Sequence, residues 1–210
     1  MKYLIRIVCI ILWISLTACS QAPNNETADL FNQVEALKLG RGDYVLGKAL
    51  TEPQRKIAQE HPVEQPTPGL YKFRDGDLFV VTQKSSDRVL ILYEQYDTVT
   101  QEKVHELVGN LFFDFGDPTV LAHDKTIYWV YGADGIMSEE EYYRIKKEKE
   151  SLETLAALKL SSSESIMGKK PKMNDKDKVA NQPSADQRNI SVYYVLSSQR
   201  LLEIITSQKN

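Results

Sequence analysis

Apolar residues recur at helical spacing along several stretches of the chain. The strongest pattern predicts a helix over residues 100–115. Its apolar residues fall on one helical stripe: Val104, Leu107, Val108, Leu111, Phe112 and Phe115. Thr98 with Gln101 fits a capping box at its start, and Gly116-Asp117-Pro118 ends it. Shorter helices are predicted over 29–39 and 51–60, and a long charged helix over 139–160.

Other stretches favour strands. Residues 78–82 and 88–93 flank a polar turn and predict a β-hairpin, residues 126–131 predict a single strand, and residues 190–196 with 200–206 predict a second hairpin. Together the elements predict an α+β fold with an antiparallel sheet of about five strands and helices mainly on one face.

The two predicted hairpins resemble each other. Ser85-Ser86-Asp87-Arg88-Val89-Leu90 aligns with Ser197-Ser198-Gln199-Arg200-Leu201-Leu202. The match suggests two duplicated α/β units, the first over 29–97 and the second over 98–206. Residues 161–189 are rich in Ser, Lys, Asp, Asn and Pro, and this composition predicts a disordered insert in the second unit.

The N-terminal residues have the pattern of an export signal. Lys2 and Arg6 precede an apolar run over 7–16, and Leu16-Thr17-Ala18-Cys19 follows. This ending resembles the bacterial lipobox. The resemblance implies a lipoprotein signal peptide over 1–18 and acylation of Cys19, for example with palmitate, whereas an ordinary signal peptide with a chance cysteine is the alternative. Residues 19–28 are then a flexible tether.

Charge and cysteine content narrow the chemistry. The 210 residues carry a formal net charge of −3, which argues against nucleic-acid binding and against electrostatic attraction to anionic lipid. Removal of the signal would take away Cys9, and acylation would occupy Cys19, so no disulfide or cysteine nucleophile would remain. Ser20 after the lipid-bearing cysteine favours the outer membrane of bacteria with two membranes, with the protein facing the periplasm.

One part of the chain is similar to a known family. The helix over 100–115, the Gly116-Asp117-Pro118 stop, the strand segment Trp129-Val130-Tyr131 and the predicted final hairpin together resemble the SmpA/BamE-type outer-membrane lipoproteins. Tandem versions of such units occur in the β-lactamase-inhibitor-protein architecture. The resemblance implies the compartment and fold and covers under a third of the chain. The long insert after Gly135 departs from the family pattern.

No strong catalytic or metal-binding motif is present. His61, His105 and His123 lack the helical i, i+4 spacing of a metal site. Asp114, Asp117 and Asp124 do not fit a calcium loop. His123-Asp124 could pair a base with its orienting carboxylate, or be two solvated loop residues. We therefore expect no catalytic residues, no metal and no cofactor.

Aromatic residues of the predicted strands are the better candidates for function. They are Tyr128, Trp129, Tyr131, Tyr193 and Tyr194. Tyr and Trp on an uncovered sheet face are typical of protein-binding surfaces, whereas on a covered face they would be ordinary core or rim residues. The first hypothesis is a non-catalytic outer-membrane lipoprotein, an accessory, assembly or interaction factor for an envelope protein complex.

Two alternatives remain. A periplasmic module that binds a ligand or a peptidoglycan fragment predicts a pocket lined by Trp129 and tyrosines. An enzyme predicts a buried cleft that holds His123 and a partner carboxylate.

Overall fold

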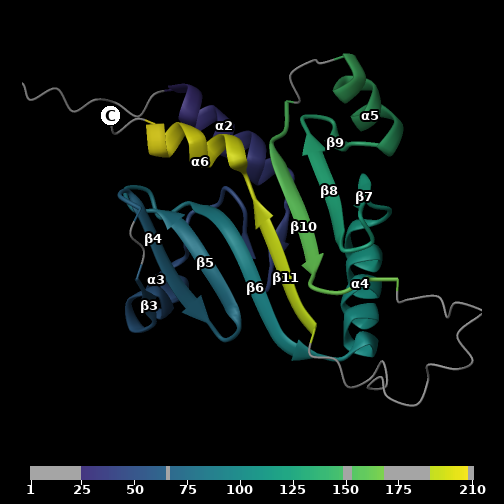
Figure 1. Ribbon diagram of the computed structural model, residues 1–210. Coiled ribbons are helices and arrows are strands. Elements are labelled where there is room, and N and C mark those ends of the chain that lie inside the picture. The colour runs from purple at the N-terminus through teal and green to yellow at the C-terminus, as the bar shows by residue number, and fades with distance from the viewer. Residues whose placement is uncertain (1–24, 65–66, 149–152, 168–189, 208–210) are drawn as a thin grey trace, which may run out of the picture.

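The computed structural model describes residues 25–64, 67–148, 153–167 and 190–207 (Figure 1). The predicted signal peptide, Cys19 and most of the predicted insert lie outside these residues. The described helices are α2 (Asn25–Ala36), α3 (Glu52–Glu60), α4 (Gln101–Phe115), α5 (Glu139–Glu148) and α6 (Gln199–Ser207).

The strands are β1 (Gly40–Arg41), β2 (Tyr44–Val45), β3 (Pro62–Val63), β4 (Leu70–Asp75), β5 (Leu78–Gln83), β6 (Val89–Val99), β7 (Val120–Ala122), β8 (Thr126–Gly132), β9 (Gly135–Ile136), β10 (Ala156–Ser162) and β11 (Ile190–Ser197). β1 and β2 pair only with each other. The others form a nine-stranded sheet in the order β3-β4-β5-β6-β11-β10-β8-β7, with β9 paired to β8. The mixed, antiparallel class is confirmed, but the expected number of about five strands is wrong.

The sheet consists of two halves with the same element order. In the first half, α3 precedes the antiparallel strands β3, β4, β5 and β6. In the second, α4 precedes β7, β8, β10 and β11, with the short strand β9 and the helix α5 inserted between β8 and β10. The last strands of the two halves, β6 and β11, pair with each other in the middle of the sheet, with Tyr93 opposite Val195. One continuous sheet therefore spans the two predicted units, 29–97 and 98–206.

Several predicted elements are present. α3 begins at the Thr51 capping box, in which Gln54 Oε1 accepts a hydrogen bond from the Thr51 amide at 2.8 Å. β5 and β6 form the predicted hairpin, and β8 is the predicted strand. α4 is capped by Thr100, whose hydroxyl accepts from the Lys103 amide, because Thr98 still belongs to β6.

The ends of the predicted tether and charged helix are wrong. α2 already begins at Asn25, inside the predicted 19–28 tether. The described part of the 139–160 helix ends at Glu148, and Ala156–Ser162 is the strand β10. In this strand Ala156, Leu158 and Leu160 are buried, so the alternation of a strand decides its structure rather than the helix propensity of Ala and Leu.

The predicted C-terminal hairpin is also wrong. Residues 200–206 belong to α6, which lies beside α2 across one end of the sheet (Figure 1). Leu201 and Ile205, one helical turn apart, are its buried residues. The sequence match between 85–90 and 197–202 therefore aligns a turn and strand with a helix start. In the predicted insert, residues 161–162 belong to β10 and Ile166 is buried.

The helices cover one face of the sheet. Buried side chains of α2, α3, α4 and α6 share a single core cluster with Leu92, Leu158 and Leu196 from the central strands. α5 contributes no buried residue. We call the opposite side of the sheet the open face.

Trp129 fixes α4 on the core face. Its ring is fully buried and meets Phe112 edge-on, with ring centroids 5.8 Å apart. Its indole Nε1–H donates to the Gly116 carbonyl at 2.9 Å, directly after α4 ends. The Gly116-Asp117-Pro118 stop therefore also positions the helix on the sheet.

α2 packs on the loop that follows β2 at a position that only glycine fits. Gly47 has a φ of +81°, and a Cβ there would lie 2.8 Å from the Glu35 nitrogen and 2.9 Å from the Phe31 carbonyl oxygen. Arg88, the residue directly before β6, stabilises the same contact. Its guanidinium donates to the Gly47 carbonyl at 3.0 Å and lies over the Phe31 ring. Close backbone approach therefore ties α2 to the sheet.

We predict that Gly47→Ala lowers the free energy of unfolding by more than about 1 kcal/mol, because it adds both backbone strain and a clash with α2. Gly109→Ala is the matched control: a Cβ at Gly109 has nothing within 4 Å, and alanine favours the helix. Urea unfolding monitored by circular dichroism measures both variants. Equal stability of the Gly47 and Gly109 variants would contradict this packing.

Candidate functional site

The sheet separates the five candidate aromatic residues into two groups. Trp129, Tyr131 and Tyr194 belong to the core, with exposed fractions of 0%, 7% and 2%. They cannot form a binding surface in this fold, which corrects the expectation that they are exposed. Tyr128 and Tyr193 lie on the open face, where Tyr193 is 43% exposed. Strand alternation produces this split, because neighbouring residues point to opposite faces.

The open face carries an unbroken row of directly opposed residues across six strands. Arg74 on β4 pairs with Phe79, Phe79 with Tyr93, Tyr93 with Val195, Val195 with Lys159, and Lys159 with Tyr128 on β8. We call these six residues the cross-strand row. At an inter-strand spacing of about 4.8 Å, the row is about 24 Å long.

Aromatic rings and cations lie next to one another at both ends of this row. Phe79 and Tyr93 stack with centroids 4.6 Å apart and planes at 6°. The Lys72 ammonium lies 5.0 Å from the Phe79 centroid and 5.3 Å from that of Tyr93. Lys159 lies 5.7 Å from the Tyr128 centroid at the other end. These are cation–π distances, so the rings hold the ammonium groups over the face.

The two lysines lack a carboxylate partner among the residues that the structure describes. Within the described ranges, neither Lys72 nor Lys159 forms an ion pair, whereas Arg74 pairs with Asp77 at 3.0 Å. The open face therefore presents positive charge on a chain whose formal net charge is −3.

Sequence reasoning missed Phe79 and Tyr93. Both lie in the hairpin that it predicted, at positions that alternate with the buried Leu78, Val80 and Leu92. The alternation could have placed both rings on one face. It could not show that β6 pairs with β11, the contact that brings them into line with Lys159 and Tyr128.

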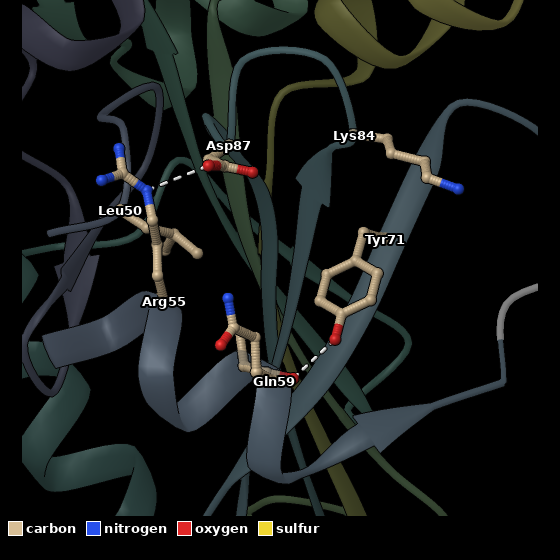
Figure 2. A pocket seen from close by; sticks show the side chains of 7 residues that line it. Leu50, Arg55, Gln59, Tyr71, Lys84 and Asp87 are labelled. Atoms are coloured by element: carbon tan, nitrogen blue, oxygen red, sulfur yellow. Dashed lines mark hydrogen bonds and ion pairs between the residues drawn. The ribbon is translucent and has the colours of Figure 1, made fainter. Parts of the chain in front are cut away.

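A separate pocket of about 270 Å³ lies between α3 and the β5–β6 turn (Figure 2). Leu50 and Ala58 supply apolar lining, and Arg55 donates to Asp87 at 3.0 Å on its rim. The Lys84 side chain points away from this ion pair. The pocket has neither Trp129 nor the candidate tyrosines among its lining residues, contrary to the expectation for a ligand-binding module. Its volume is just under the range of about 300–1,000 Å³ common for small-molecule sites.

A partly buried polar cluster lies on the core face, behind the middle of the row. Arg41 donates to both carboxylate oxygens of Glu94, at 3.1 and 2.8 Å, and Tyr96 donates to Glu94 Oε2 at 2.6 Å. The hydrogen bond to Glu94 raises the pKa of Arg41, which keeps the guanidinium charged. Arg41 is the last residue of β1, and Gly42-Asp43 form the turn to β2.

The histidine and aspartate candidates do not form a site. His123 and Asp124 are exposed in the β7–β8 turn, both with positive φ. Asp114 and Asp117 are exposed near the end of α4. Across the described residues, no three His, Cys, Asp or Glu side chains come together to hold a metal ion.

No protein-family model, curated protein or solved structure matches this chain. The resemblance to SmpA/BamE-type lipoproteins therefore stays a prediction, and function is argued from the site alone.

The buried tyrosines make the stability pH-dependent. Burial raises the pKa of Tyr131 to about 12, from the ordinary value of 10.0. Its contribution is fully present below pH 10 and is lost as the pH rises from about 10 to about 12, because the unfolded chain ionises first. We predict that Tyr131→Phe loses less stability than the parent between pH 8 and pH 11, measured by urea unfolding with circular dichroism.

Tyr143→Phe is the control for this measurement, because Tyr143 is 47% exposed on α5. It should keep the parent's alkaline loss. A Tyr131 variant with the full parental loss would contradict the assignment.

Proposed function

We propose that this protein is a non-catalytic, lipid-anchored interaction module of the bacterial outer membrane that docks an envelope protein on the open face of its sheet. The cross-strand row is the observation that carries the proposal. It places the aromatic rings of Phe79, Tyr93 and Tyr128 beside an aliphatic side chain, and aromatic residues are enriched at protein interfaces. The core helices α2, α3, α4 and α6 pack on the other face, and every residue of the row is exposed or partly exposed.

The lipobox pattern supports the proposed anchor. None of the helices in the described ranges has the length and apolar run needed to cross a membrane. Acylation of Cys19 with more than one chain would hold the protein stably on a bilayer. Anchoring would raise the effective concentration of the row toward membrane neighbours, so modest contacts would suffice for binding.

A small-ligand binding module is the second candidate, and the pocket in Figure 2 is the observation that favours it. An enzyme that uses His123 has weaker support, because this histidine is exposed in a turn. The cross-strand row favours a protein partner over both, since its length of about 24 Å exceeds the reach of most small molecules.

We predict that Cys19 carries fatty acid. Cells that express the protein and are fed an alkyne-labelled palmitate should yield a labelled band, and Cys19→Ser should abolish the label and release the protein from the membrane fraction. Mass spectrometry of the processed N-terminus identifies the modification. An unmodified thiol at Cys19 in the mature protein would overturn the anchor.

We predict that a photo-crosslinking amino acid in place of Tyr193 captures one reproducible envelope protein in living cells. Tyr193 is exposed on the open face, and its neighbours across the strands are Gln95 and Ser161. The matched control is the same amino acid in place of Phe113, which is 91% exposed on α4. Mass spectrometry of the crosslinked band identifies the partner.

Comparing crosslinking at positions 193 and 113 distinguishes specific docking from nonspecific association. A specific partner should appear at position 193 and not at 113. The same partner at both positions, or none at position 193 while the protein is membrane-bound, would argue against docking through the open face. In the Cys19→Ser background the yield should fall, because the effective concentration is lost.

A further inference from the structure

We infer that the occupant of the cross-strand row is an extended, acidic segment of a protein, an inference that rests on the proposed function and specifies its partner. Its carboxylates would meet the Lys72 and Lys159 ammonium groups, and its backbone would lie across the strands over Phe79 and Tyr93.

The charge pattern of the open face indicates the sign of the partner's charge. Arg41, Arg55 and Arg88 all have carboxylate partners. Within the described ranges the Lys72 and Lys159 ammonium groups form no ion pair and lie over aromatic rings. A ring face leaves the outward donors of an ammonium group free for an anion. The row is thus positively charged although the chain as a whole is acidic.

The spacing gives the form of the partner. Lys72 lies on β4 and Lys159 on β10, with β5, β6 and β11 between them. Lys72 lies two residues along β4 from the row, so four inter-strand steps and this offset together separate the two Cα positions by about 20 Å. An extended peptide that rises about 3.3 Å per residue covers this distance in about six residues. A short unstructured segment with acidic residues at both ends therefore fits the row.

A protein segment fits better than a lipid surface. Anionic headgroups are typically bound by clusters of about four to eight Lys and Arg residues. Here the row has only Arg74 and Lys159, with Lys72 beside it, and Arg74 is already paired with Asp77. The intervening residues Phe79, Tyr93 and Val195 suit the side chains and backbone of a peptide.

The test titrates the folded mature protein with an end-capped octaglutamate peptide and follows backbone amide resonances. Saturable shifts should centre on the row, and octalysine should produce none. The Lys72→Glu/Lys159→Glu variant should bind about tenfold more weakly or worse. Lys38→Glu/Lys48→Glu is the matched control: it makes the same change in net charge at two exposed lysines distant in sequence from the row's strands, and should bind like the parent.

Three results would overturn the inference. The first is an equal loss of octaglutamate affinity in both double variants, and the second is resonance shifts centred away from the row. The third is tighter binding of phosphatidylglycerol vesicles or of a single-stranded oligonucleotide than of octaglutamate. The proposed function fails separately. If the crosslinker at position 193 still captures an envelope protein, the open face docks a partner of different chemistry, and only the acidic segment is wrong. Circular dichroism confirms that both double variants are folded.

Discussion

The antiparallel pairing of β6 with β11 is the contact on which the architecture depends. It joins two four-stranded halves, each preceded by its own helix, at residues separated by about half the chain. Because successive side chains along each strand point to opposite faces, the register of this pair also determines which residues share a face. Glu94 and Tyr194 meet on the core face, while the adjacent Tyr93 and Val195 meet on the open face. Without this register, neither the continuous core nor the cross-strand row would exist.

The core side of this junction is unusually polar. Arg41 pairs with Glu94, whose side chain is 11% exposed, and the guanidinium lies 5.0 Å from the centre of the Tyr194 ring. Removing one member of a buried ion pair typically costs about 3–5 kcal/mol, whereas an apolar replacement of both members is often neutral. The pair is therefore weak evidence for high stability. Its geometry favours a single register instead, because a one-residue slip of β11 would remove the Tyr194 ring from the guanidinium.

Sequence analysis predicted the elements that have local signals. It failed where contacts between residues far apart in the sequence determine the secondary structure. Thr51 and Gln54 cap α3 through neighbouring atoms. The predicted α4 stripe contains the buried Val104 and Leu111, although its Phe112 is 36% exposed. β10 was missed because Ala156–Leu160 consists of good helix formers, and only its position between β8 and β11 makes it a strand. α6 was missed although Ser198 starts it and Leu201 and Ile205 share one face; the β-branched Ile204-Ile205-Thr206 run favoured a strand in isolation.

The candidate site shows the same division between local and distant information. Alternation within one strand separates Tyr128 from Trp129, but it does not tell which of the two is buried. That depends on where α4 packs, and the hydrogen bond from Trp129 to the Gly116 carbonyl connects the two. The turn that ends α4 thus holds Trp129 in the core, and strand alternation then places Tyr128 on the open face. The same hydrogen bond that holds α4 on the core face therefore leaves Tyr128 beside Lys159 on the opposite face of the sheet.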